Sequence, residues 1–373
     1  MGKKSRKRKI SLALSLIFIT LTVFISFPVS VYANDNAAED FFDKFVGIAP
    51  EGSIGDGSSE EIISGVGFDA LLAEILSAVR SSGSSALSFF SLCLGLALSF
   101  AAVEGIGALS ADTLKYMRSA VAAVGSYFMF CGLFPLISSV RDSIASLSSF
   151  FSALVPIASG IIATGGALGT ASVQALNMNL ALAVIEKIGA ELLLPLCITS
   201  FALSLVCAVD GEISSPLIKG VRSVFNWAMG IVTTVLLSSL SLQTILSSAK
   251  DSAALRAAKY AVSGSIPIVG STVSGALSTL FGSLSYAGTG IGVGSIFIIV
   301  SMAVSPLVLL LSYRVAISLS RSVVSFFGTQ GANSIFSSFL SALDSLIAVY
   351  VSCVVIYLLE IIIFLRCGVK IFA

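Results

Sequence analysis

Long apolar runs fill the chain between about residues 86 and 365 and set its predicted architecture. Each run reaches or exceeds the roughly 20 residues that an α-helix needs to cross a bilayer. Backbone groups in lipid must be satisfied within the segment, which favours helices, and the runs lack the alternation of a membrane β-strand. The pattern predicts an all-α polytopic transmembrane helical bundle with roughly six to eight membrane segments, drawn from the runs at about 86–108, 119–139, 147–168, 178–209, 224–246, 262–284, 290–312 and 335–365.

The N-terminus has the three parts of a secretory signal peptide. A Lys/Arg-rich start precedes the apolar stretch from Ile10 to Phe27, and the small-residue site Val31-Tyr32-Ala33 follows. This order predicts a signal peptide at residues 1–33, cleaved after Ala33. The alternative is an uncleaved first membrane helix, because the apolar stretch is close to the lower length limit for spanning.

Residues 34–85 form a polar region, which the signal peptide predicts to be exported. Near its end, apolar positions recur on one face of a helix, as in an amphipathic segment. Such a short helix would lie on the membrane or dock a partner. The apolar face comprises Phe68, Leu71, Leu72, Ile75, Leu76 and Val79.

An internal duplication is predicted within the transmembrane domain, residues 86–373. The stretch beginning "VRDSIASLSSFFSALVPI" and the stretch beginning "AKDSAALRAAKYAVSGSIPI" share a basic-Asp-Ser start, an amphipathic part and a Pro-Ile pair. Their prolines, Pro156 and Pro267, are 111 positions apart, and Pro195 and Pro306 show the same offset. The repeats would cover about residues 113–223 and 224–334.

Each predicted repeat contains an apolar run interrupted by glycine and proline, residues that weaken a plain helix. Broken helices at equivalent places in two halves mark substrate sites in transporters, so these positions are candidates for a broken-helix pathway. Close packing of helices through small residues explains the glycines equally well. Lys and Arg occur in nearly every loop, so the charges decide neither the topology nor whether the Pro-Ile segments span or re-enter. The candidates are Pro156, Gly160, Gly165, Gly166, Pro267, Gly270 and Gly275.

Four charged residues lie inside or beside apolar runs: Glu186, Lys187, Glu191 and Glu360. Charges at such depth are costly and often line an aqueous pathway. For the first three, an interfacial ion pair is the preferred interpretation, because Lys187 and Glu191 are four residues apart and can pair along one face. For Glu360, snorkelling toward an interface is the simplest explanation.

Composition supports the membrane assignment and excludes other classes. Of 373 residues, 56% are hydrophobic and 11% charged, far from the roughly 25% charged residues of a soluble domain. The net charge of +1 suggests no nucleic-acid partner, and the chain has no histidine. No catalytic or nucleotide-binding motif occurs in its required context. We therefore expect no enzyme activity, no catalytic residues, no metal site and no cofactor.

The order of several short motifs resembles the stage III sporulation protein AE family of endospore-forming Firmicutes. These are the signal peptide, the exported polar region, "RAAKYAVSGSIPIVGSTVSGAL" from Arg256, the "LLLPL" helix and a hydrophobic C-terminal end. The similarity covers most of the chain after about residue 65. The resemblance implies a multi-pass membrane protein made by the mother cell and located in the outer forespore membrane.

The same resemblance implies a function and partners. The chain would be a membrane subunit of the sporulation channel, or feeding-tube, complex that links mother cell and forespore and is needed for late forespore development. Its partners would be membrane lipid, the other stage III A-operon proteins, including a cytoplasmic ATPase and ring-forming subunits, and indirectly stage II sporulation protein Q. The alternatives are a stand-alone secondary transporter with duplicated broken helices and a structural scaffold that recruits ring-forming partners.

Overall fold

The computed structural model describes most of the chain beyond residue 67. The predicted signal peptide, the polar region up to residue 67 and Pro267 lie outside the described residues. The described residues are 68–105, 111–164, 168–209, 220, 223–225, 227, 230, 234, 270–326 and 330–372.

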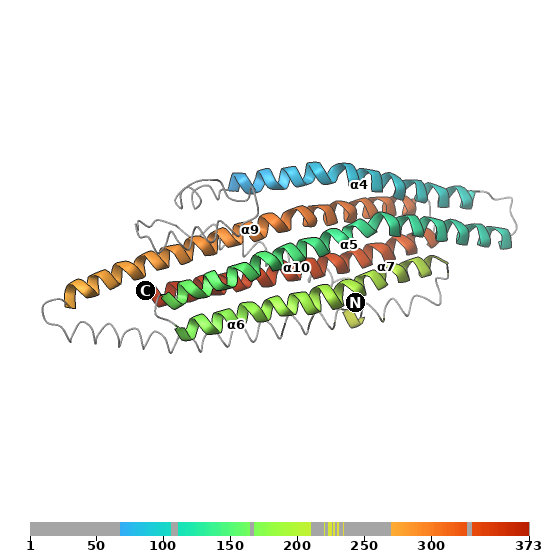
Figure 1. Cartoon of the computed structure of the whole chain (residues 1–373). Helices are drawn as coiled ribbons and strands as arrows, with labels where there is room; N and C mark the ends of the chain where they lie inside the picture. The colour runs from blue at the N-terminus through green and yellow to red at the C-terminus, as the bar shows by residue number, and fades with distance from the viewer. Residues whose placement is uncertain are drawn as a thin grey trace.

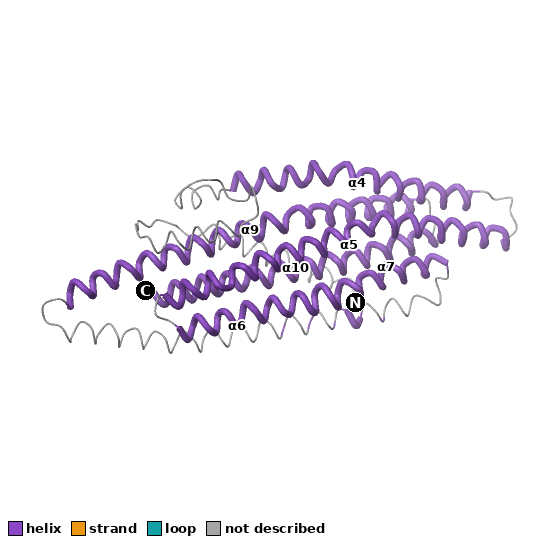
Figure 2. Tube along the Cα trace, viewed as in Figure 1, coloured by secondary structure: helices purple, strands orange, loops and turns teal. Residues whose placement is uncertain are grey.

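Every described residue is helical, which confirms the all-α prediction. The helices are long rods that lie side by side in an elongated bundle (Figures 1 and 2). In chain order they are α4 (Phe68–Gly105), α5 (Ala111–Thr164), α6 (Leu168–Val184), the π-helix η1 (Ile185–Leu193), α7 (Leu194–Val209), α9 (Gly270–Phe326) and α10 (Gln330–Phe372).

Four of these helices are long and apolar enough to cross a membrane, at Ile75–Val103, Tyr116–Thr164, Gly290–Phe326 and Ala332–Leu365. The described part therefore supports a membrane protein but does not confirm six to eight segments. The main difference lies in α5, which joins the two predicted segments 119–139 and 147–168 into one helix of 54 residues. At 1.5 Å per residue it is about 80 Å long, more than twice the hydrocarbon thickness of about 30 Å.

Two prolines inside α5, Pro135 and Pro156, do not end the helix. A proline in a helix interior removes one backbone hydrogen bond and costs about 3 kcal/mol. Serine hydroxyls nearby supply bonds in this region: Ser138 donates to the carbonyl of Pro135 at 2.9 Å, and Ser159 donates to that of Val155 at 2.9 Å. The carbonyls that Pro135 and Pro156 leave without a donor belong to Cys131 and Ser152, four residues earlier, so these serine bonds do not replace the lost ones. The helix nevertheless continues through both prolines.

The predicted amphipathic stretch is also part of a longer helix. α4 begins at Phe68 and continues without interruption through the first predicted membrane segment to Gly105. Ile75, Leu76 and Val79 from the predicted apolar face are exposed on the bundle, whereas Ala78 is buried. The predicted boundary between residues 85 and 86 therefore falls inside one helix.

Contacts between side chains fix the direction of each rod. α4 is antiparallel to α5, because Leu96 lies against Gly125 and Phe89 lies against Gly132. α9 is antiparallel to α10, where Arg314 donates a 2.7 Å hydrogen bond to Asp344 and Arg321 donates one of 2.7 Å to Asn333. The two hairpins pack along each other through α4 and α9 (Figure 1).

α5 and α10 run in the same direction. Ser143 shares a 2.8 Å hydrogen bond with the Tyr350 hydroxyl, and farther along both helices Ser148 shares one of 2.7 Å with Tyr357. Since each hairpin is antiparallel, α4 and α9 are parallel as well. The hairpins α4–α5 and α9–α10 therefore pack in the same orientation.

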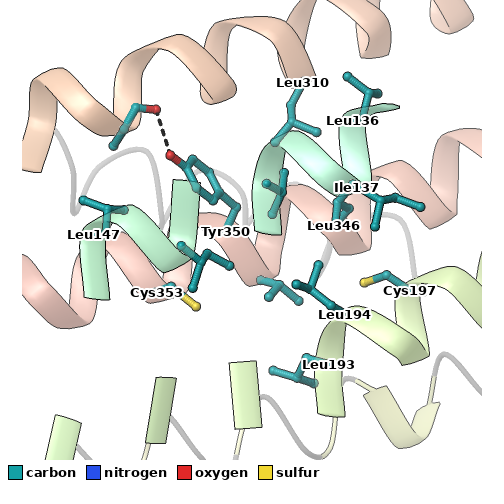
Figure 3. Close-up of a cluster of buried hydrophobic side chains, with 14 of the residues drawn as sticks. Leu136, Ile137, Leu147, Leu193, Leu194, Cys197, Leu310, Leu346, Tyr350 and Cys353 are labelled. Atoms are coloured by element: carbon teal, nitrogen blue, oxygen red, sulfur yellow. Dashed lines mark hydrogen bonds between the residues drawn. The ribbon is translucent and has the colours of Figure 1, made fainter. Parts of the chain in front are cut away.

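The rod made of α6, η1 and α7 covers α5 and α10 from the other side. It is antiparallel to α10: Gly189 lies against Cys353, and Phe201 packs against Phe339 with ring centroids 6.4 Å apart. Figure 3 shows the core where these rods meet, with Tyr350 and buried leucines from α5, η1, α7, α9 and α10. This core positions the polar groove described below.

The predicted duplication is not confirmed by the described residues. The chain leaves α5 at Thr164 and returns antiparallel to it as α6 from Leu168. The positions 111 residues later, 275–279, lie inside the uninterrupted helix α9. The chain therefore turns back at the end of α5 but continues straight at the equivalent positions of α9. Much of the second predicted repeat lies outside the described residues.

Candidate functional site

A polar groove lies on the bundle between the middle of α5 and η1. It has a volume of about 510 Å³. Arginine, glutamate and three serines border it, in a bundle whose interior is otherwise mostly apolar. Its lining residues are Arg141, Ile144, Ala145, Ser148, Ser149, Ser152, Ala153, Glu186 and Ala190. We call it the Arg141–Glu186 groove.

The α5 wall of the groove follows from the spacing of small and polar residues in "RDSIASLSSFFSA", residues 141–153. Arg141, Ala145, Ser148 and Ser152 recur at intervals of three or four residues and so share one face of a helix. The intervening Leu147, Phe150 and Phe151 face the core, where all three are buried. The same segment thus packs on one side and leaves a hydroxyl-rich strip on the other.

The opposite wall comes from η1, a π-helix of nine residues. The backbone N–H of Leu194 donates to the carbonyl of Gly189, five residues earlier, which is the hydrogen bond of a π-helix. Pro195 follows and has no N–H to offer an α-helical bond. Within η1, Glu186 and Ala190 are four residues apart and both line the groove.

The charges near η1 divide into two groups. Lys187 donates a 2.8 Å hydrogen bond to Glu191, and the two side chains are 70% and 61% exposed. This is the ion pair expected from their spacing, and a pair so exposed contributes little to stability. Glu186, by contrast, lines the groove opposite Arg141, and neither forms an ion pair with a described residue.

One cation, one anion and several hydroxyls in a groove can hold a small polar solute or water. Charged side chains make shorter and stronger hydrogen bonds than neutral ones. Both charges are exposed to solvent. The groove therefore offers a polar surface on an apolar bundle.

Behind the groove, a set of hydroxyls ties three helices together. Ser148 lines the groove and is bonded to Tyr357 of α10. One turn earlier on α5, Ser143 is bonded to Tyr350, whose hydroxyl is 3.2 Å from the carbonyl of Ala303 in α9. The Tyr350 hydroxyl is visible in Figure 3. The groove wall is thus anchored to α9 and α10.

The predicted broken-helix positions lie elsewhere on the bundle. Pro156 and Gly160 belong to the last part of α5, beyond the groove, and the helix is continuous through both. Gly270 and Gly275 lie in the first turns of α9, at the same end of the bundle as the end of α5 (Figure 1). Gly165, Gly166 and Pro267 are outside the described residues. Their assignment to a pathway stays a prediction.

Two features escaped the sequence reasoning. The predicted segments 119–139 and 147–168 leave Arg141 between them and place the groove serines inside the second one. The helical spacing of these residues is the signal that could have shown their common face. Glu360 was expected to reach an interface, but its side chain is fully buried in α10. Because the residues around Glu360 are apolar on every side of the helix, the sequence does not show whether this acid faces the core or the surface.

Comparisons with known proteins give the family. The sequence model of the stage III sporulation protein AE family matches residues 107–368, which include the groove. The stage III sporulation protein AE of Bacillus subtilis (strain 168) is 24% identical over 219 residues, 57% of this chain and 52% of that protein. The match thus spans about half the length of the curated relative, and no solved structure matches the chain. The chain belongs to the stage III sporulation protein AE family.

Proposed function

We propose that the chain is a membrane subunit of the channel complex that links mother cell and forespore during sporulation. Membership of the stage III sporulation protein AE family over residues 107–368 carries this proposal. The helices long enough to cross a membrane support it, because a channel subunit must be embedded in the bilayer. The proposal assigns no catalytic reaction to the chain.

We further propose the location and partners that such a role requires. The chain would cross the mother-cell-derived outer forespore membrane several times. It would assemble with other stage III A-operon proteins, including the cytoplasmic ATPase and ring-forming subunits, and indirectly with stage II sporulation protein Q. The Arg141–Glu186 groove supports a part in passage or docking, because it places polar groups on an otherwise apolar bundle.

A stand-alone secondary transporter is the second candidate. The groove favours it, since unpaired charges in a membrane bundle commonly mark a solute or ion pathway. A transporter would move solute as a purified protein, whereas a channel subunit needs its complex. Solute uptake by vesicles that contain only this chain would support the transporter and contradict the channel subunit.

Removing both groove charges is expected to abolish the sporulation role without removing the protein. The test is the double variant Arg141→Gln with Glu186→Gln in the sporulating bacterium that encodes the chain. Both side chains are exposed in the groove, so their replacement leaves the core intact. We expect normal abundance in the membrane, and late forespore gene expression reduced to the level of a deletion strain. A forespore-specific fluorescent reporter measures this expression.

The control is Lys187→Gln with Glu191→Gln, which also removes one positive and one negative charge but outside the groove. It is expected to sporulate normally. Normal reporter expression in the groove variant, together with failure in the deletion strain, would contradict a role for the groove and favour the scaffold. Co-purification of the cytoplasmic ATPase with the wild-type chain tests the proposed complex separately.

A further inference from the structure

Glu360 is a buried carboxyl group that the proposed function does not use. Its side chain is 0% exposed, and neither carboxylate oxygen has a hydrogen-bond partner. The ion pairs Arg314–Asp344 and Lys187–Glu191 do not involve it. An ionised carboxylate left unpaired in an apolar interior costs several kcal/mol or more. The bundle would avoid this cost if the group were neutral.

The groups around Glu360 can be placed by the register of the helices. On α10, Tyr357 precedes it by one turn and Phe364 follows by one turn, and both are buried. On α5, the Ser148–Tyr357 bond and the packing of Phe151 on Tyr357, with ring centroids 4.6 Å apart, put Phe151 and Ser152 at its height. No basic residue occupies this height on α5.

The other two neighbouring rods are equally free of basic groups at this height. The contacts of Gly292 with Leu365 and of Tyr350 with Ala303 place Ser295 of α9 opposite Glu360. Ser295 is buried and donates to the carbonyl of Ile291 at 2.6 Å. The Gly189–Cys353 contact places the buried Ala181 of α6 at the same height.

Among the residues that the structure describes, the charged side chains nearest along the chain lie away from this height. Glu186 and Arg141 are at the exposed groove, and Lys187 is paired with Glu191 on the outside of η1. Arg366 is six residues farther along α10, which places its Cα about 120° around the helix axis from that of Glu360. A proton is therefore the neutralising partner that the surroundings favour.

A hydroxyl pair lies between the groove and the turn of α10 that precedes Glu360, although the Glu360 carboxylate itself bonds neither hydroxyl. Ser148 lines the groove, shares a 2.7 Å hydrogen bond with Tyr357, and Tyr357 is one turn from Glu360 on the same helix. We propose that Glu360 is a proton-binding site, which exchanges its proton with the Arg141–Glu186 groove through the Ser148–Tyr357 hydroxyl pair. In the exchange, the carboxylic acid releases one proton to groove water and becomes a carboxylate, and uptake reverses this. The inference does not rest on the channel proposal, because it concerns the purified protein alone.

Infrared spectroscopy of the purified full chain in lipid tests the binding site. At neutral pH we expect a carbonyl band of a neutral carboxylic acid, which disappears in Glu360→Gln and shifts in Glu360→Asp. The control Glu186→Gln should keep this band, because Glu186 is exposed in the groove. Glu360→Gln is expected to melt at the same temperature as the wild type, since it replaces a neutral acid by a neutral amide.

Absence of the neutral-acid band from the wild type, or its persistence in Glu360→Gln, would overturn the proposal. If Glu360→Gln does not fold, the wild-type band and its shift in Glu360→Asp decide.

Deuterium exchange tests the route. After transfer to D₂O, the neutral-acid band of the wild type should shift as the carboxyl proton is replaced. Tyr357→Phe removes one hydroxyl of the proposed route and should slow this shift, whereas Ser149→Ala, which changes a groove serine outside the hydroxyl pair, should not. Equal exchange in the wild type and Tyr357→Phe would overturn the route through the hydroxyl pair.

Discussion

Replacing Gly132 by leucine is expected to destabilise the bundle by about 2 to 4 kcal/mol. A Cβ atom at this position would lie 2.8 Å from two ring carbons of Phe89. The ring has little freedom to move, because it stacks on Tyr313 with centroids 4.7 Å apart. The expected loss combines overpacking, about 1 to 3 kcal/mol, with damage to an aromatic pair of about 0.5 to 1.5 kcal/mol. Thermal unfolding of the purified protein, followed by circular dichroism, measures the change.

Gly95→Leu is the matched control. Gly95 lies on α4 with open space around it, so added side-chain atoms meet no neighbour. Leucine is also a better helix former than glycine by up to about 1 kcal/mol. The control should therefore melt at the wild-type temperature or above it. Equal destabilisation by the two variants would show that α4 and α5 do not approach each other at Gly132 as described.

The second large effect is expected at the ion pair between α9 and α10. Arg314→Leu should destabilise the protein by about 2 to 4 kcal/mol. Arg314 donates a 2.7 Å hydrogen bond to Asp344, whose side chain is only 15% exposed. Breaking a fully buried pair costs about 3 to 5 kcal/mol, and we discount this range because Arg314 is 37% exposed. Melting curves of the purified variants provide the measurement.

Two further variants make this test specific. Arg314→Leu with Asp344→Leu removes both charges and should recover most of the lost stability, because no buried charge is left without its partner. Lys187→Leu breaks an exposed pair and should leave the melting temperature unchanged. A double variant as unstable as Arg314→Leu alone would contradict the pairing of Arg314 with Asp344.

The helical class was predictable from the sequence, but the ends of the helices were not. Apolar runs of membrane length decide that the backbone must be helical. Arg141 and Asp142 fall between the predicted segments 119–139 and 147–168, because charges are costly inside a membrane span. In the bundle both are exposed on one helix, where they need not enter the core. Local composition therefore could not show that α5 continues.

The glycines illustrate a second limit of the sequence. Reasoning from breaker-rich runs singled out Gly270 and Gly275, which lie in the first turns of α9. Tight contacts between described helices occur at Gly132 against Phe89 and at Gly292 against Leu365, glycines that no breaker-rich pattern marks. A glycine is required where the side chain of a neighbouring helix approaches its Cα closely. A local sequence pattern does not show which helices pack against each other. Glu186 was among the predicted candidates because charge within an apolar run is visible locally.

The continuity of α5 also makes it a mechanical lever. Gly132, where the helix contacts α4, and Ser152, which borders the groove, are 20 residues and about 30 Å apart on one rod. No loop lies between them, and Pro135, close to Gly132, is the point in this stretch where a backbone hydrogen bond is missing and the helix can bend. A tilt of about 10° about Gly132 would therefore move Ser152 by roughly 5 Å, about the rise of one helical turn. Such a displacement of Ser152 would change the width of the groove that it borders.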